Sequence, residues 1–255
     1  MKCKFCYATF QDVSVIQQMT SENVVKILTK LKKAGVEKVT FAGGEPFLYK
    51  DLMYVIIKAK ELGLTTSIIT NGSLLTPAWM FAMIGHLDWI GISIDSLCTD
   101  TNIKIGRTSN KEVNYHTLLH YIKDYGYKLK VNTVVNRFNE KERMSSFIEF
   151  FEVDRWKVFD TLKVKGQNDK QFDAIKPKDF NGFILNNTTK NMVVETNELM
   201  TGSYLLINPV GQIYENWGTG EVKSDSLINF SVKHCLKQVT LDKDRFIARG
   251  GEYKW

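Results

Sequence analysis

Residues 36 to 48 read VEKVTFAGGEPFL, a short strand pattern that ends in a Gly-Gly-Glu-Pro turn. Apolar Val39 and Phe41 alternate with polar neighbours, which is the period of two that predicts a β-strand. The two glycines that follow allow a tight turn or a close approach of the backbone to a ligand. The stretch therefore predicts a strand whose end presents bare backbone and one carboxylate.

Helix and strand patterns alternate along the chain on both sides of this stretch. A first helix can be capped by Thr20 or Ser21 and stopped by Gly35. The expected strands cover residues 37 to 42, 64 to 70, 89 to 95, 128 to 136 and 156 to 164. The later helices lie near 50 to 62, 77 to 85, 111 to 125, 140 to 151 and 178 to 185. This alternation predicts right-handed βα units and a parallel sheet.

The pattern contains one helix more than it contains strands, so the first helix lacks a preceding strand. That strand would lie upstream of Cys3. With it restored, we expect an α/β fold in which residues 1 to 186 form a partial (βα)6 barrel. Residues 187 to 255 would be a C-terminal extension that closes the site. In barrels the active site gathers at the C-terminal ends of the strands.

Two cysteines near the start of the chain, Cys3 and Cys6, form a CxxC motif. Such a motif also occurs in zinc sites and in thioredoxin-like redox pairs. Zinc would need two more ligands at compact spacing, whereas the other cysteines are Cys98 and Cys235 and the four histidines have no matched arrangement. A redox pair normally precedes a helix, but residues 7 to 19 show no helical period. Both alternatives are therefore disfavoured.

Length and composition favour one domain with a sizeable core. The chain has 255 residues, of which 44% are hydrophobic, and it has no Pro, Gly or Ser-rich linker. No apolar run approaches the roughly 20 residues needed to span a membrane. Four cysteines without a disulfide framework suggest a reducing compartment. The net charge of +6 fits an anionic ligand or simply a lysine-rich surface.

Lysines stand on the expected inward faces of three strands. Lys38, Lys130 and Lys157 each alternate with apolar residues that should face the outer helices. An uncompensated charge in the interior costs on the order of several kcal/mol. Few acidic residues share these faces, so we expect a polyanionic ligand such as a triphosphate. The alternative is that each lysine reaches the barrel mouth or pairs with an internal carboxylate.

The CxxC motif with Phe5 between its cysteines, followed by a strand and GGEP, resembles the radical S-adenosylmethionine superfamily. The motif of that superfamily is CxxxCxΦC, in which Φ is aromatic. Its first cysteine would fall just before Met1, so we expect the sequence to lack a short N-terminal segment that carries both this cysteine and the first strand. Three thiolates would hold a four-iron cluster with one iron open to the cofactor.

Longer stretches resemble the viperin family in order and spacing over nearly the whole chain. They are EKVTFAGGEPF, ITNGSLL, ISIDS with IGR, KVNTVVNRFN, RWKVF, SYLLI and RGGEYKW. The resemblance implies conversion of a nucleoside triphosphate to its 3′-deoxy-3′,4′-didehydro analogue, which terminates viral RNA chains. It also implies a 4Fe-4S cluster, S-adenosylmethionine and an electron donor such as flavodoxin or ferredoxin.

Nothing in the sequence resembles the amphipathic membrane helix of animal viperins. We therefore expect a cytoplasmic, prokaryotic-type relative with no membrane or nucleic-acid partner. The identity of the nucleotide base, whether cytosine, uracil or guanine, does not follow from the sequence.

The resemblance also assigns roles to individual residues. The cluster ligands would be Cys3 and Cys6. The residues that hold S-adenosylmethionine would be Phe5, Gly43, Gly44, Glu45, Ser93 and Arg107. The triphosphate and its nucleoside would contact Lys38, Lys130, Asn132, Arg155, Lys157 and Arg249. Tyr204 would donate a proton or a hydrogen atom near the substrate ribose.

Each assignment has an ordinary structural alternative. The glycines could serve only a turn, Tyr204 could be a hairpin core residue, and Arg249 could be solvated. Two other functions also compete: a peptide-modifying radical enzyme, and a nucleotide-binding sensor without a cluster. Peptide-modifying enzymes commonly carry a cysteine-rich C-terminal region, whereas the C-terminal region of this chain contains only Cys235. A cysteine four residues before Cys3 would distinguish the enzyme from the sensor.

Overall fold

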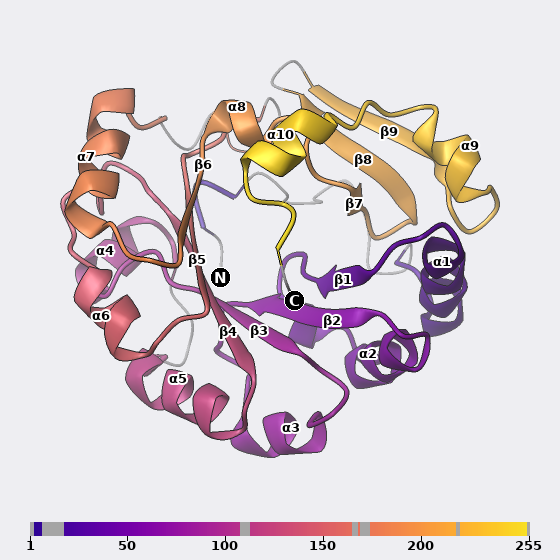
Figure 1. Cartoon of the computed structure of the whole chain (residues 1–255), viewed down its shortest axis with the longest axis horizontal. Coiled ribbons are helices and arrows are strands. Elements are labelled where there is room, and N and C mark those ends of the chain that lie inside the picture. Colours follow the sequence, from indigo (N-terminus) through magenta and orange to yellow (C-terminus); the bar gives the residue numbers. More distant parts are fainter. Residues whose placement is uncertain are drawn as a thin grey trace.

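The computed structural model describes residues 3–6, 18–107, 113–164, 168, 174–217 and 220–253. A six-stranded sheet in the order β1 to β6 curves around the centre of the molecule, with helices on its outer side (Figure 1). Its strands are β1 (Lys38–Phe41), β2 (Thr65–Thr70), β3 (Trp89–Ser93), β4 (Lys128–Val134), β5 (Arg155–Phe159) and β6 (Met192–Glu195). Every neighbouring pair is parallel, which confirms the predicted α/β class and the partial barrel.

The helices follow the predicted order along the chain, with a short 3₁₀ turn and one short α-helix added. They are α1 (Ser21–Lys33), a short 3₁₀ turn (Pro46–Leu48), α2 (Leu52–Glu61), α3 (Pro77–Ala82), α4 (Thr99–Lys104), α5 (Tyr115–Asp124), α6 (Ser145–Phe150) and α7 (Pro177–Asn187). Thr20 caps α1 by accepting a hydrogen bond from the backbone N–H of Asn23 at 3.4 Å. The short helix α4, which directly precedes Arg107, was not predicted.

The register of the sheet separates an apolar outer face from a charged inner face. Register partners in parallel strands share a face, and Val131 pairs with Trp156 on the side covered by helices. On the opposite side, Lys130 stands beside Arg155 and Asn132 beside Lys157. The predicted inward orientation of these residues is therefore confirmed.

The sixth strand is the main departure from the expected pattern. The strand predicted over residues 156 to 164 ends at Phe159, because the chain then turns and the Thr161 hydroxyl donates to the Val135 carbonyl oxygen. The parallel sheet instead gains β6, which lies beyond residue 186 in the predicted C-terminal extension. The sequence of β6, MVVE, places three apolar residues in a row and so lacks the alternation that made the equally short β1 recognisable. The expected upstream strand lies outside the described residues and stays a prediction.

The remaining elements cover one end of the sheet. They are α8 (Asn197–Met200), the antiparallel strands β7 (Leu206–Ile207), β8 (Gln212–Trp217) and β9 (Gly220–Ser226), and the helices α9 (Val232–Leu236) and α10 (Lys243–Ala248). A separate apolar cluster joins Ile27 and Leu31 of α1 to Ile213 of β8 and to Leu227, which directly follows β9. In the ranges that the structure describes, no helix combines the length and apolar character required to cross a membrane.

Candidate active site

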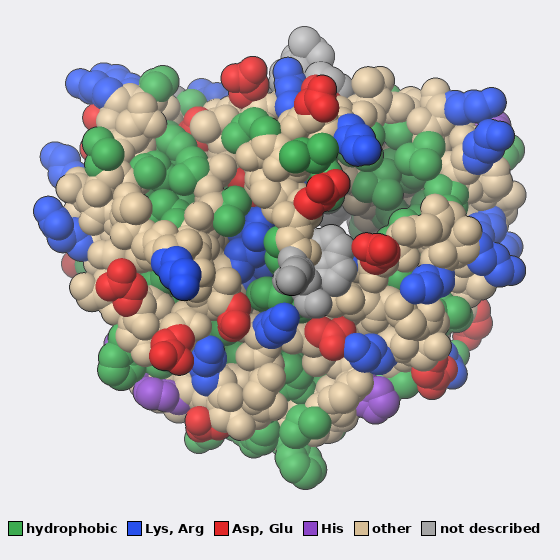
Figure 2. Space-filling model, in the orientation of Figure 1, with side chains coloured by type: hydrophobic (Ala, Val, Ile, Leu, Met, Phe, Trp, Pro, Cys, Tyr) green, Lys and Arg blue, Asp and Glu red, His purple; other side chains and the backbone are tan. Residues whose placement is uncertain are grey.

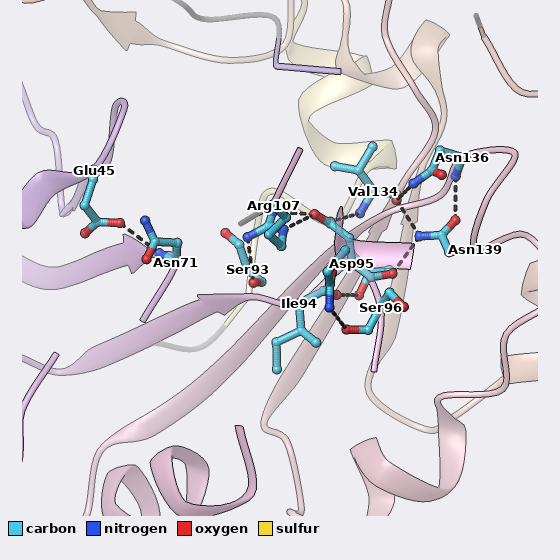
Figure 3. A network of polar contacts seen from close by, with 12 residues as sticks. Glu45, Asn71, Ser93, Ile94, Asp95, Ser96, Arg107, Val134, Asn136 and Asn139 are labelled. Atoms are coloured by element: carbon cyan, nitrogen blue, oxygen red, sulfur yellow. Dashed lines mark hydrogen bonds and ion pairs between the residues drawn. The ribbon is translucent and has the colours of Figure 1, made fainter. Parts of the chain in front are cut away.

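The Gly-Gly-Glu turn after β1 is held by its carboxylate. Glu45 Oε1 accepts a hydrogen bond from the Thr70 hydroxyl at 2.6 Å, and Oε2 accepts one from the Asn71 backbone N–H at 3.0 Å (Figure 3). Gly43 has a φ of +129°, and a Cβ added at Gly43 or Gly44 would meet no atom within 4 Å. The turn thus offers open backbone next to a fixed carboxylate, which suits an amino group that approaches closely.

The cysteines Cys3 and Cys6 share one tight turn. The Cys6 backbone N–H donates to the Cys3 carbonyl oxygen at 3.1 Å. Between them, Phe5 is buried against Ile105, and its carbonyl oxygen accepts a hydrogen bond from the Asn168 side-chain amide at 2.8 Å. Asn168 is itself buried, so this loop is anchored from a distant part of the chain.

The donor set of this loop fits part of a 4Fe-4S site. Burial raises the pKa of the Cys3 thiol, while the nearby Arg107 acts in the opposite direction. Over the described ranges, no three His, Cys, Asp or Glu side chains form a group that could hold a metal ion. Cys3 and Cys6, both free thiols in one turn, would supply two of the three thiolates that such a cluster needs.

A buried ion pair joins Arg107 to Asp95 beside this loop. The guanidinium Nε donates to Asp95 Oδ2, and a second nitrogen donates to the Ser93 carbonyl oxygen at 3.0 Å (Figure 3). Asp95 Oδ1 also accepts from the Val134 backbone N–H at 2.8 Å, which ties the end of β4 to the same carboxylate. Arg107 and Ser93, both of which the resemblance assigns to S-adenosylmethionine, thus lie together, whereas Asp95, present in the quoted ISIDS, was not recognised.

The inner face of the sheet carries a group of cations around one tyrosine. Lys38 Nζ donates to the Tyr253 hydroxyl oxygen at 2.6 Å, and Lys130 Nζ donates to the same oxygen at 3.1 Å. The Arg155 guanidinium lies 3.8 Å from the centre of the Tyr253 ring. Lys38 also lies 4.6 Å from the centre of the Trp89 indole ring. Lys and Arg side chains are visible in the opening near the centre of the face that Figure 2 shows.

A second group surrounds Glu195 at the end of β6. Its carboxylate forms an ion pair with Lys157, lies 3.7 Å from the Arg249 guanidinium, and accepts a hydrogen bond from the Tyr204 hydroxyl. Arg249 also stacks over the Tyr204 ring at 3.6 Å. Tyr204 and Arg249 therefore lie within the site.

For Lys157 the alternative reading, pairing with an internal carboxylate, is the one that the structure shows. Its partner, Glu195, stands on the strand that the sequence pattern did not reveal. Lys130 and Arg155 differ in this respect, because neither has a carboxylate within ion-pair distance among the described residues.

Burial and mutual repulsion depress the pKa values of the inward lysines. Burial, with Arg155 and Lys157 next in effect, lowers the pKa of Lys38 to about 7. Burial, with Lys38 next in effect, lowers the pKa of Lys130 to about 6. Burial lowers the pKa of Lys157 to about 8, although Glu195 opposes the shift. An anion that entered the site would reverse these shifts, since it would favour the charged lysines.

Asn132 lies on the same inner face of the sheet as these lysines. It pairs with Ser93 of β3 on one side and with Lys157 of β5 on the other. Its side-chain oxygen is buried and has no hydrogen-bond partner in the described structure. Apart from Asp95 and Glu195, the site residues that the sequence did not reveal are Trp89 and Tyr253, although Tyr253 stands in the quoted RGGEYKW.

Comparison with known families agrees with this geometry. Residues 1–151 match the model of the radical SAM superfamily. Native anSMEcpe with bound AdoMet aligns with a TM-score of 0.64 and 15% identity, over 100% of this chain and 80% of that one. Streptococcus suis SuiB bound to S-adenosylmethionine aligns with a TM-score of 0.60 and 22% identity, over 76% and 47% of the two chains. The chain belongs to the radical SAM superfamily, whose cofactors are a 4Fe-4S cluster and S-adenosylmethionine.

Relatives at higher identity narrow the family. A protein of Flammeovirga pacifica named S-adenosylmethionine-dependent nucleotide dehydratase is 38% identical over 100% of this chain and 92% of its own. Its counterpart in Lacinutrix mariniflava is 41% identical over the whole chain, which spans 56% of that relative. The RSAD2 protein of Danio rerio is 30% identical, over 100% and 74% of the two chains. The chain is thus a member of the viperin-like S-adenosylmethionine-dependent nucleotide dehydratase family.

Proposed function

We propose that this protein converts a nucleoside triphosphate to its 3′-deoxy-3′,4′-didehydro analogue, with loss of water. The observation that carries the proposal is the presence of Lys130 and Arg155 on the inner face of the sheet without a carboxylate partner in the described part of the chain. Keeping these side chains charged without a counter-charge is costly, as the lowered pKa of Lys130 shows, and a bound polyanion would supply that counter-charge. The relatives are named nucleotide dehydratases, which supports a nucleotide as the source of that negative charge.

The arrangement of charges suits a polyphosphate better than a single carboxylate. Five cationic side chains share the inner site, and the carboxylate of Glu195 pairs with two of them. They are Lys38, Lys130, Arg155, Lys157 and Arg249. A triphosphate presents several oxygen acceptors along an extended chain, so it can accept hydrogen bonds from separated ammonium and guanidinium groups.

The protein would place the ribose between these cations and the cofactor turn. The amino end of S-adenosylmethionine fits the open Gly43–Gly44 backbone and the fixed Glu45 carboxylate. When bound, the cluster and S-adenosylmethionine would supply the radical chemistry that removes a hydrogen atom from the ribose. Holding the triphosphate at its far end fixes the ribose, because even about 1 Å of misplacement can cost two orders of magnitude in rate.

Tyr204 is suited to proton or hydrogen transfer near the ribose. Its hydroxyl donates to Glu195 and accepts a hydrogen bond from Lys157 at 3.1 Å. These contacts fix the direction of the Tyr204 O–H bond and link the hydroxyl to two ionisable groups, Glu195 and Lys157. We propose that Tyr204 donates the proton with which the 3′ hydroxyl leaves as water, while an electron from the external donor completes the product; Glu195 and Lys157 would fix the orientation of Tyr204.

The proposed product lacks a 3′ hydroxyl, so a polymerase that incorporated it could not extend the chain. This property fits a role in antiviral defence. The proposed reaction also consumes electrons from outside the protein, for which we propose a flavodoxin or ferredoxin. No nucleic-acid or membrane partner is needed for this chemistry.

The test is product analysis with anaerobically reconstituted protein, S-adenosylmethionine and a reductant. Each of the cytidine, uridine, guanosine and adenosine triphosphates should be offered separately, together with the matching monophosphates and a peptide mixture. We expect 5′-deoxyadenosine to form well above background with at least one triphosphate, together with a product lighter by one water. Stimulation by peptides, or equal stimulation by monophosphates, would contradict the proposal.

A further inference from the structure

The C-terminal segment reaches the centre of the barrel because of two glycines after α10. Gly250 has a φ of +68°, and its carbonyl oxygen accepts a hydrogen bond from Arg155. A Cβ on Gly251 would lie 2.5 Å from the Phe246 carbonyl oxygen. Both positions therefore require glycine. The chain that leaves α10 then runs inward to the middle of the barrel, where Figure 1 marks the C-terminus.

This path delivers Tyr253 into the group of cations. Its hydroxyl oxygen accepts hydrogen bonds from Lys38 and Lys130, and its ring lies under the Arg155 guanidinium. The edge-to-face contact with Trp89, at 5.8 Å between ring centres, fixes the tilt of the ring. One neutral side chain thus contacts three cations that come from β1, β4 and β5.

A phenol side chain provides two of the interactions that an anion would provide to these cations: a hydrogen-bond acceptor and a region of negative electrostatic potential. Its oxygen has two lone pairs and can accept from both lysines, and its π face attracts Arg155. Each ammonium has three N–H groups. The bond to Tyr253 fixes the direction of each lysine stem and leaves other N–H groups to point elsewhere. The ring also separates positive charges that would otherwise repel one another across a narrow space.

We infer that Tyr253 is a positioning residue of the polyphosphate site, which holds Lys38 and Lys130 in the orientation that receives phosphate oxygens. This inference rests on the proposed function, because it assigns Tyr253 to the same triphosphate site. It predicts that loss of the hydroxyl weakens polyphosphate binding even though Tyr253 need not touch the ligand. It also predicts a change in proton linkage, since the hydroxyl favours the charged form of both lysines.

Several other charged groups act on the same lysines and must stay unchanged in the test. They are Asp88 and Lys128 near the start of β3 and β4, Arg155 and Lys157 on β5, and Glu195 on β6. Arg249, at the end of α10, acts on the Tyr253 hydroxyl and must stay unchanged as well. Without the hydroxyl, the pKa values of Lys38 and Lys130 should fall further below about 7 and about 6. The ligand-free variant would then hold fewer protons near pH 7, and binding would take up more of them.

The test uses inorganic tripolyphosphate as the probe, because it needs no base or ribose. Titration calorimetry of the full chain in buffers of different ionisation enthalpy gives both the affinity and the protons taken up. Tyr253→Phe should weaken binding about 3- to 10-fold, the range expected for one hydrogen bond, and should increase proton uptake at neutral pH. Tyr253→Leu, which also removes the ring, should weaken binding further.

Tyr127→Phe is the matched control. The Tyr127 hydroxyl donates to the Met80 carbonyl oxygen in the core outside the barrel, so its loss should lower the melting temperature without changing tripolyphosphate binding. If Tyr253→Phe bound the probe like the parent and with the same proton uptake, the positioning role would be overturned while the triphosphate site stood. If the parent itself failed to bind tripolyphosphate, the proposed function would be contradicted.

Discussion

Lys157 and Glu195 form a buried ion pair between neighbouring strands of the parallel sheet, and the same carboxylate holds the Tyr204 hydroxyl. The side chain of Glu195 is fully buried, and that of Lys157 is 11% exposed. Arg249 approaches the same carboxylate from the end of α10. Glu195 therefore joins the sheet, the catalytic candidate and the C-terminal extension in one contact. The stability of the empty site and the placement of Tyr204 should both depend on it.

Glu195→Gln should destabilise the ligand-free protein. The change leaves Lys157 and Arg249 buried without their counter-charge, and breaking a buried pair typically costs about 3–5 kcal/mol. Thermal unfolding should show a drop of several degrees, which added tripolyphosphate should partly reverse by supplying negative charge. The double variant Lys157→Met/Glu195→Gln should recover part of the loss. An unchanged melting temperature in the single variant would mean that Glu195 carries little charge in the folded protein.

Lys130→Met should behave in the opposite way. Because no described carboxylate depends on Lys130, its removal relieves desolvation and repulsion, so the ligand-free melting temperature should stay equal or rise. Nucleotide binding should weaken by roughly 1.5–3 kcal/mol, the range for a hydrogen bond to a charged group. Unfolding and calorimetric titration of the same samples provide both quantities. A large loss of ligand-free stability with unchanged affinity would show that Lys130 is a structural residue.

The pH dependence of stability provides a separate check on Lys130. Its pKa is about 6 in the folded protein and has an ordinary value of 10.5 when unfolded. Between these values the unfolded chain binds more protons, so this residue makes the protein more stable as the pH rises from about 6 toward 10. Lys130→Met should flatten that part of the profile. The measurement is the free energy of unfolding in urea at several pH values, with parent and variant compared at each.

Cys6→Ala should abolish binding of the 4Fe-4S cluster. The matched control is Cys98→Ala, because Cys98 is exposed at the start of α4 and forms no part of the cysteine turn. After anaerobic reconstitution, iron content and the visible absorption of the cluster should be lost in the first variant and kept in the second. Cleavage of S-adenosylmethionine should likewise be lost in Cys6→Ala and kept in Cys98→Ala. A Cys6 variant that kept the cluster would remove this loop from the metal site.

Asp95→Asn should weaken S-adenosylmethionine binding through Arg107. The substitution keeps the size of the side chain but removes the charge that holds the buried guanidinium, and it leaves that cation uncompensated. We expect a lower melting temperature and a weaker affinity for S-adenosylmethionine, measured by calorimetry on reconstituted protein. Asn191→Ala, which removes a hydrogen bond to the Val153 carbonyl oxygen at the other end of the strands, should reduce stability without changing that affinity.

Local patterns in the sequence determined the class of fold and much of the site. Alternation with a period of two placed Lys130 and Lys157 on the inner face, because side chains of a strand point to opposite sides in turn. Strands separated by helices predicted parallel pairing, which the structure confirms for β1 to β5. The Gly-Gly-Glu turn and the cysteine turn were recognisable because their residues are adjacent in the chain. In each case the information lies within a few residues.

Tertiary structure decided which charges are compensated and by what. Tyr253 meets Lys38 across 215 residues and Lys130 across 123, and Asn168 meets Phe5 across 163. The strand β6 has no alternation of apolar and polar residues, so the pairing of Glu195 with Lys157 could be seen only once the sheet was assembled. A pattern records which face a side chain takes, but the partner on that face depends on how distant segments pack. That packing follows from burial of the whole apolar surface, which no local stretch encodes.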